Sequence, residues 1–400
     1  MTRLLLPYLL LAACAVNAAA QSAGGSQDAN LRRLIQRVES LESEVRQLRA
    51  EKSSTSISAE ASEAAFAQSD GAMRSQYPEL KLRGFGHAEY HWTDSSAEKN
   101  SFVLGAFDLF ITSQLAEDVS VLSESVVETD EEGRFGFEIE RLVLQYTPHE
   151  WLNFAVGRYH TSIGYYNTTY HHGTWLETAV SRPRILDFED EGGLLPIHDV
   201  GVSVSGAIPS GRLGLHYVAE IGNGRDYTPG AEPVQNVKDK NSFKALNLAL
   251  YARPDWLPGL QAGVSVHFDR LSAALLPTVN QTIASAHAVY VSPEFEWLNE
   301  VVLLRHESSL GTFQTLGGYS QIARRFGKFR PYLRYQFLDG SERDPLVQLA
   351  GVAGLQQTLS LGVRFDFTAL AALKLQWDHT LDAEEDAPGN ELTLQMSFTF

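Results

Sequence analysis

Apolar and polar residues alternate one by one over long segments from Leu80 to the last residue, Phe400. In the closing stretch LTLQMSFTF (392–400), Leu, Met and Phe occupy every second position, with Thr, Gln and Ser between them. The stretch LSLGVRFDF (359–367) keeps the same period. Because successive side chains of a β-strand point to opposite faces, this pattern predicts strands with one apolar and one polar face.

The length of these segments favours a transmembrane barrel over a soluble sheet. Many run for roughly 10–15 residues, whereas soluble strands are typically about 5–6 residues long. Aromatic residues gather at segment ends, in YHW (90–92), in FEW (295–297) and at Trp377, as the interfacial girdles of a barrel require. After residue 20, no apolar run approaches the roughly 20 residues of a membrane-spanning helix. We therefore expect an all-β fold, a transmembrane antiparallel β-barrel over residues 80–400, with its apolar face toward lipid.

Sixteen segments carry the alternation, and an even number brings both ends of the barrel to the same side of the membrane. The connections between them are alternately short and long, as expected for periplasmic turns and external loops, and the long ones are 162–198, 224–242, 272–281, 341–354 and 382–390. A barrel of this size encloses an aqueous lumen. The expected strands are 80–94, 101–116, 118–130, 134–147, 152–161, 199–209, 211–223, 243–254, 260–271, 282–292, 295–308, 312–327, 329–340, 355–369, 371–381 and 391–400.

The first 20 residues are typical of a secretory signal peptide. A basic residue, Arg3, precedes an apolar run, and small residues end at Ala20. The alternative is lipoprotein cleavage before Cys14 in LAAC, which would make Cys14 a lipidated N-terminus. Cleavage after Ala20 would leave the mature chain without its single cysteine, and so without a disulfide, a thiol nucleophile or a cysteine zinc site.

A short leader (21–30) is followed by a segment with heptad spacing. Apolar residues recur over about three heptads, which predicts a parallel coiled coil over 31–50, with a single amphipathic helix as the alternative. Residues 51–79, rich in Ser, Ala and Glu, are expected to be a linker. The coiled coil would assist oligomerisation through Leu31, Leu34, Val38, Leu41, Val45 and Leu48.

Several stretches, taken in order, resemble bacterial outer-membrane porins with an N-terminal coiled coil, related to the phosphate-selective (O/P-type) porins. They are VGRYHTSIGYYNTTYHHGTWLET (156–178), FEDEGGLLPIHDVGV (188–202), GLQAGVSV (259–266), FRPYLRYQF (329–337) and the closing LTLQMSFTF. The resemblance implies a homotrimer in the outer membrane of a Gram-negative bacterium, with the coiled coil in the periplasm, and passive diffusion of small hydrophilic solutes. The final Phe400 resembles the signal read by the barrel-assembly machinery. Phosphate selectivity in that family rests on lysine-rich pores, whereas this chain has only seven lysines after residue 80.

The longest connection, 162–198, is the third external loop, which folds inside the barrel in the porins that the chain resembles. A loop of this size calls for a functional reason, and pore constriction is one. Its acidic residues would face basic residues on the opposite strands, giving a transverse field that sets ion preference. The alternatives are that these charges only solvate the wall, or that Arg182 and Arg184 pair within the loop. The acidic residues are Glu177, Asp187, Glu189, Asp190 and Glu191, and the basic pore-wall residues are Arg330, Arg334, Arg364 and Lys374.

The remaining conspicuous residues of this loop are expected to hold it in place. Histidines beside carboxylates could bind a metal, but adjacent histidines on a loop do not easily bind one ion, and no helical pair at i and i+4 is evident. We therefore expect no metal and no cofactor. The residues expected to pack the loop against the wall are Tyr165, His171, His172, Trp175 and His198.

Charge and residue types weigh against other functions. The net charge of −17 at pH 7 makes nucleic acid an unlikely partner, since phosphate backbones are bound by basic surfaces. We expect no enzymatic activity, although Ser320 and His306, followed by Glu307, leave a hydrolase as an alternative. Another alternative is an anchor that tethers the outer membrane to the cell wall through the coiled coil. The acidic total favours cations while the wall arginines favour anions, so the sign of ion selectivity and the solute stay open.

Overall fold

The computed structural model describes residues 77–95, 100–129, 133–170, 173–189, 192–225, 237–239, 241–273, 276–383 and 389–400. The predicted signal peptide, leader and coiled coil, and nearly all of the predicted linker, lie outside these residues. Within the described ranges, no helix has the length and apolar character needed to cross a membrane.

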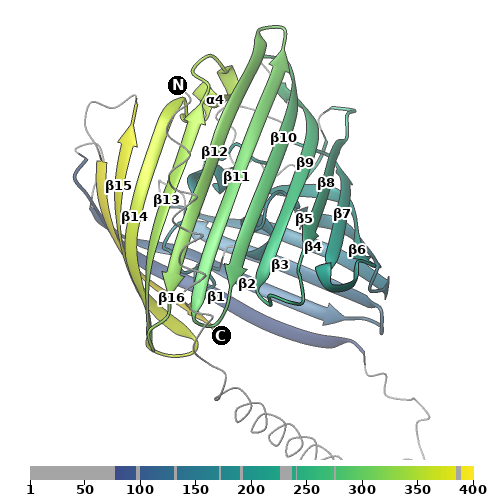
Figure 1. Ribbon diagram of the computed structural model, residues 1–400, viewed down its shortest axis with the longest axis horizontal. Helices are drawn as coiled ribbons and strands as arrows, with labels where there is room; N and C mark the ends of the chain where they lie inside the picture. Colours follow the sequence, from purple (N-terminus) through teal and green to yellow (C-terminus); the bar gives the residue numbers. More distant parts are fainter. Residues whose placement is uncertain are drawn as a thin grey trace, which may run out of the picture. The chain divides into compact units, whose positions relative to one another are not determined.

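The described chain folds into sixteen β-strands that pair into one closed barrel, which confirms the predicted fold class. Neighbours in sequence pair antiparallel, and β1 pairs with β16 to close the ring, with Phe85 opposite Thr399 and Trp92 opposite Leu392. The strands run side by side as one tilted wall (Figure 1). Their bounds are β1 (Glu79–Thr93), β2 (Ser101–Gln114), β3 (Val119–Thr129), β4 (Phe135–His149), β5 (Leu152–His160), β6 (His198–Ile208), β7 (Leu215–Gly222), β8 (Ala245–Ala252), β9 (Leu260–Ala273), β10 (Leu276–Val291), β11 (Phe295–Ser308), β12 (Gly311–Arg324), β13 (Phe329–Gly340), β14 (Gly354–Asp366), β15 (Ala371–Asp382) and β16 (Gly389–Thr399).

The two faces of the wall differ as the alternation predicts. In β16, Leu394 and Met396 point outward and are 41% and 48% exposed, whereas Gln395 and Ser397 point inward and are fully buried. The apolar face is therefore the outer one. Such a face is stable against lipid tails, and the polar inner face finds its hydrogen-bond partners inside the barrel.

The prediction of a long connection over 272–281 is wrong. Strand β9 runs to Ala273 and β10 begins at Leu276, so the two strands extend farther than the alternation indicates. The reason is that inward positions here are apolar, since Leu271 and Val279 are buried against Leu346 of α4 (Pro345–Leu349). An apolar inward face removes the contrast on which a period of two depends.

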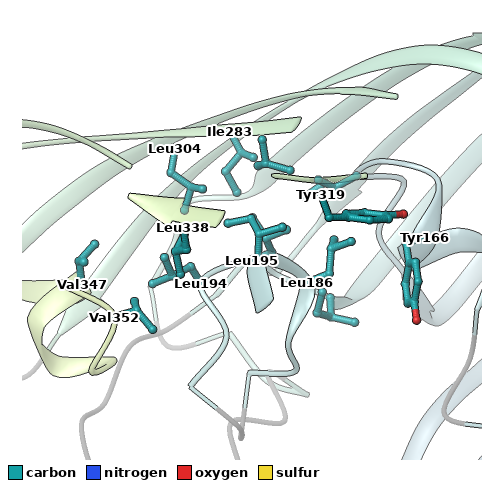
Figure 2. Close-up of a cluster of buried hydrophobic side chains, with 14 of the residues drawn as sticks. Tyr166, Leu186, Leu194, Leu195, Ile283, Leu304, Tyr319, Leu338, Val347 and Val352 are labelled. Atoms are coloured by element: carbon teal, nitrogen blue, oxygen red, sulfur yellow. The ribbon is translucent and has the colours of Figure 1, made fainter. Parts of the chain in front are cut away.

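An apolar core lies inside the barrel, where an open channel would carry water. It joins residues of the connection between β5 and β6, including the 3₁₀ turn η1 (Arg184–Leu186), to inward residues of β10 to β13 and to the α4 connection (Figure 2). Burying a large aliphatic side chain stabilises by roughly 1.5–3 kcal/mol. The connection is therefore a packed part of the barrel interior. Its core members are Ile163, Tyr166, Tyr170, Ile185, Leu186, Leu194, Leu195 and Ile197.

Candidate pore constriction

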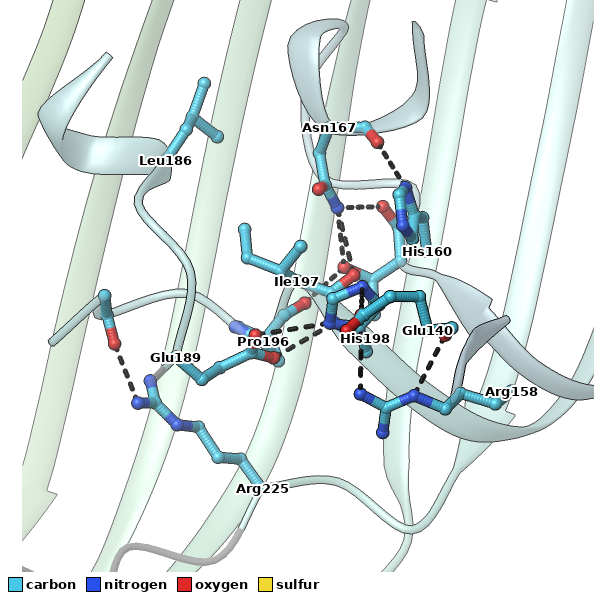
Figure 3. A network of polar contacts seen from close by, with 12 residues as sticks. Glu140, Arg158, His160, Asn167, Leu186, Glu189, Pro196, Ile197, His198 and Arg225 are labelled. Atoms are coloured by element: carbon cyan, nitrogen blue, oxygen red, sulfur yellow. Dashed lines mark hydrogen bonds and ion pairs between the residues drawn. The ribbon is translucent and has the colours of Figure 1, made fainter. Parts of the chain in front are cut away.

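The connection between β5 and β6, residues 161–197, is called the inner loop below. Its two ends are held together, because Thr161 N donates to Ile197 O at 3.0 Å. Asn167, fully buried, donates from Nδ2 to the carbonyls of Thr161 and Ile197 at 2.8 and 3.2 Å. His160 and His198, the paired ends of the two strands, lie next to these bonds (Figure 3). The described parts of the loop thus leave the wall and return to it at adjacent positions.

The inner loop crosses the lumen to strands β11 and β12. Its short helix α3 (Tyr166–Thr169) meets Glu300 of β11, whose carboxylate accepts from the backbone N–H groups of Tyr165 and Tyr166 at 2.6 and 2.8 Å. Tyr319 of β12 donates its hydroxyl to the same carboxylate at 2.7 Å. Glu300 is only 4% exposed, so three donors satisfy a buried anion and fix the start of the loop.

Two arginines on β13 and β14 hold the middle of the loop. Arg334 donates to the carbonyl and the hydroxyl of Ser181 at 2.6 and 2.7 Å. Arg364 donates to the carbonyls of Trp175 and Glu177 at 2.6 and 2.7 Å. Both guanidinium groups therefore bond to the loop backbone, with the planar geometry that arginine allows.

The other two predicted basic residues act in the same way. Lys374 of β15 donates from Nζ to the carbonyls of Thr174 and Ala179 at 2.6 and 2.9 Å. Arg330, at the start of β13, donates to the hydroxyl of Thr178 at the longer distance of 3.2 Å. The structure thus brings all four basic residues to the inner loop, with Arg334 and Lys374 fully buried.

This arrangement corrects the expectation that the basic residues face the loop across open water. Arg334, Arg364 and Lys374 lie beneath the loop and contact it directly, so no passage separates them from it. The physical reason is that the backbone carbonyls of a folded-in loop need donors, and long cationic side chains supply them. The acidic side chains of the loop do not pair with these cations at hydrogen-bond distance in the described residues.

The described loop carboxylates have local partners. Glu177 accepts from the Tyr166 hydroxyl at 2.8 Å, and burial raises its pKa. Asp187 forms an ion pair with Arg184 at 2.7 Å, and burial raises its pKa to about 6. Burial also opposes the ionisation of Glu189, but its hydrogen bonds with His198 outweigh that effect and lower its pKa. Asp190 and Glu191 lie outside the described residues.

The alternative of pairing within the loop is therefore correct for Arg184. Arg182 behaves differently, since its Nε donates to the Leu186 carbonyl at 2.8 Å and its guanidinium stacks 4.1 Å from the ring centroid of Phe188. The ring centroid of Tyr166 lies 5.2 Å from the same guanidinium group. A guanidinium between two rings is held by cation–π attraction.

Of the five residues predicted to pack the loop, three lie among the described residues and two do not. Tyr165 packs against the inner core, Trp175 stacks on Phe85 of β1 with ring centroids 6.5 Å apart, and His198 lies 2.9 Å from Glu140 and 3.4 Å from Glu189. His171 and His172 lie outside the described residues. Among the described residues, no three His, Cys, Asp or Glu side chains are grouped as a metal ion would require.

Residues that sequence reasoning did not single out also position the loop. Glu300 fixes α3, Glu220 of β7 accepts from the backbone and hydroxyl of Ser162 at 3.0 Å each, and Glu140 of β4 pairs with His198. The available signal was an acidic residue at an inward register position of a strand. That signal says only that the side chain faces the lumen, because its partner comes from a distant loop.

The Ser320 and His306 pair of the hydrolase alternative does not form. Ser320 is exposed on the outer face and donates to Asn299 at 2.7 Å. His306 is buried on the inner face, 2.6 Å from Asp344. The two side chains lie on opposite faces of the wall, so they do not constitute a nucleophile and a base.

The inner loop divides the space inside the barrel. On one side, a cavity of about 360 Å³ is bounded by β1 to β5, β15, β16 and the loop residues from Thr174 to Glu189. We call it the β1–β5 cavity. On the other side, a cavity of about 220 Å³ is bounded by β7 to β10 and the first residues of the loop, and we call it the β7–β10 cavity.

Comparisons with known proteins identify the class of fold. No known family profile matches the chain, and no curated protein matches it in sequence. Solved structures do match: the anion-selective porin from Comamonas acidovorans has a TM-score of 0.59 at 10% identity, over 81% of this chain and 100% of that one.

Two further porin-type structures are similar. The outer membrane channel DcaP of Acinetobacter baumannii has a TM-score of 0.56 at 12% identity, over 82% of this chain and 99% of its own. OmpF of Salmonella typhi has a TM-score of 0.55 at 13% identity, over 81% of this chain and 98% of its own. The fold is that of the bacterial outer-membrane porins.

Proposed function

We propose that the protein is an outer-membrane porin, a passive diffusion channel for small hydrophilic solutes or ions. The observation that carries the proposal is the inner loop, which is bonded across the lumen of a closed barrel and leaves a cavity of about 360 Å³ beside it. A wall with an apolar outer face and an interior narrowed by a fixed loop suits size-limited diffusion and needs no chemistry.

In this proposal the inner loop is the constriction. Its carboxylates Glu177, Asp187 and Glu189 border the β1–β5 cavity, and Asp190 and Glu191 belong to the same segment. The basic wall residues hold the loop in place by hydrogen bonds, which keeps the distance between the loop and strands β1 to β4 constant. A fixed gap gives a fixed size limit.

The finer assignment follows the sequence resemblance to coiled-coil porins related to the O/P type. It comprises export by the signal peptide, an outer-membrane location in a Gram-negative bacterium, a homotrimer and a periplasmic coiled coil. Assembly through Phe400 is supported by the place of this residue at the barrel seam, where its backbone exchanges hydrogen bonds of 3.0 and 3.1 Å with Gly84. Phosphate specificity is not part of the proposal, because the few cationic side chains near the loop bond to its backbone.

Liposome swelling tests the proposed function. Vesicles containing the purified protein are placed in isotonic solutions of neutral sugars of increasing size, and the initial swelling rate is measured. The proposal predicts rapid swelling in the smallest sugars and a steep fall with size, and no swelling with the same protein heat-denatured before reconstitution. Folded protein that gives no swelling with any sugar would contradict it.

A further inference from the structure

The two cavities beside the inner loop differ in charge. The β1–β5 cavity is lined by nine carboxylates, two arginines and three histidines, a formal excess of seven negative charges with the histidines counted as neutral. The wall contributes carboxylates from five strands, among them Glu89 of β1, Glu128 of β3, Glu138 of β4 and Asp378 of β15. The described lining of the β7–β10 cavity has no carboxylate and one arginine, Arg253. The charge that a solute meets therefore depends on which side of the loop it passes.

The basic residues that could offset the acidic wall do not line the β1–β5 cavity. Arg334, Arg364 and Lys374 are bonded to loop carbonyls on the opposite face of the loop. Because these three cations are bonded to the loop and lie outside the lining, the charges nearest to a solute in the cavity are the lining carboxylates.

The two arginines of the β1–β5 cavity are themselves restrained. Arg158 is 6% exposed and its Nε donates to the Glu140 carbonyl at 2.9 Å. Arg182 is 9% exposed, and its Nη1 and Nη2 atoms have no hydrogen-bond acceptor among the described residues. Both guanidinium groups are therefore buried and offer little surface to an ion in the cavity.

We propose that the β1–β5 cavity is the conducting passage and that it selects hydrated cations over anions. The inference rests on the proposed channel function and adds to it the route and the class of solute. A narrow passage with low-dielectric walls concentrates the field of its lining charges, so fixed carboxylates raise the local concentration of cations and repel anions. The charge excess stays negative even if buried Glu177 is protonated, because eight other carboxylates line the same space.

The test is the reversal potential of the purified full-length protein in a planar bilayer under a tenfold KCl gradient. A perfectly selective passage gives about 59 mV for this gradient, positive or negative according to the ion that passes. The expected result has the sign of potassium preference. The preference should be several-fold larger with 10 mM against 100 mM KCl than with 100 mM against 1 M, because the screening length shortens from about 30 Å to about 3 Å over this range.

The outcomes separate the two proposals. Current with a zero potential overturns the acidic route. A potential with the sign of chloride preference also overturns it and points to the β7–β10 cavity with Arg253. A folded protein that passes no current overturns the channel function itself, and the route with it.

Paired substitutions test the assignment to this cavity. Glu89→Gln with Asp378→Asn should reduce the potassium preference several-fold, whereas Glu150→Gln with Glu294→Gln removes the same charge from exposed turns and should leave it unchanged. Arg182→Gln should change it in the opposite direction, to greater potassium preference. Where the double variant of the cavity folds poorly, Arg253→Gln supplies the test, since a change in selectivity with this variant would place conduction in the β7–β10 cavity.

Discussion

Replacement of Arg334 by methionine should loosen the inner loop while the barrel stays folded. Arg334 is fully buried on β13 and donates two hydrogen bonds, at 2.6 and 2.7 Å, to the carbonyl and hydroxyl of Ser181. Methionine fills a similar volume but donates nothing, so Ser181 loses both hydrogen bonds from this side chain and keeps only the long one of 3.5 Å from Gln376. The sixteen-stranded ladder does not depend on this side chain, because the backbone of β13 keeps its pairing with β12 and β14.

The magnitude follows from the two bonds. Hydrogen bonds to charged groups contribute roughly 1.5–3 kcal/mol each, which gives roughly 3–6 kcal/mol for the pair. Removing a buried charge also relieves its desolvation cost, so the loss of docking free energy lies near the lower end, about 3 kcal/mol. That loss lowers the ratio of docked to undocked loop by roughly 150-fold.

Single-channel recording measures the effect as open-channel current noise and mean conductance. Arg334→Met should increase both relative to the wild-type protein. Arg330→Met is the matched control on the same strand, because Arg330 makes one longer bond of 3.2 Å from a partly exposed position and should lose only about 1 kcal/mol. Equal noise and conductance in the wild type and both variants would refute the idea that Arg334 holds the constriction.

Three further predictions concern pH, the inner core and the N-terminal segment. Because burial raises the pKa of Asp187 from 3.8 to about 6, its ionisation costs free energy in the folded protein, so its contribution to stability falls as the pH rises from about 4 to about 6. Its negative charge is lost as the pH falls through about 6, so potassium preference measured as reversal potential should decrease from pH 7 to pH 5, and Asp187→Asn should lack that step. Leu195→Ala should cost about 2–5 kcal/mol of loop packing and admit larger sugars in liposome swelling, whereas Leu310→Ala, 55% exposed, should not; equal swelling profiles would count against the packed loop. Deletion of residues 31–50 should reduce the trimer fraction in analytical ultracentrifugation without preventing barrel formation, and an unchanged fraction would rule out an oligomerisation role.

The sequence predicts the barrel well because the alternation is itself the physical cause of the fold. Outward Leu394 and inward Gln395 must face different surroundings, so their order records the geometry of the strand directly. The alternation does not indicate the strand extensions at Leu271 and Val279, where α4 makes the inward surroundings apolar too. Local pattern and tertiary contact differ at this point, and the contact determines the strand ends.

The sequence predicts which residues form the candidate site, but it does not predict which atoms they contact. The basic row on β13 to β15 can be inferred from register, and Arg334, Arg364 and Lys374 do meet the predicted loop. Their partners are backbone carbonyls, which every residue carries and which leave no mark in the sequence. For the same reason the sequence indicates neither the anchor at Glu300 nor the side of the loop on which open space remains.

The most direct test of the central claim, a barrel that conducts beside a docked loop, is a single-channel recording of the purified wild-type protein in a planar bilayer. The account predicts stepwise current through a water-filled passage, with steps grouped in threes as expected of a trimer. A correctly folded protein that inserts into the bilayer and passes no current would contradict it.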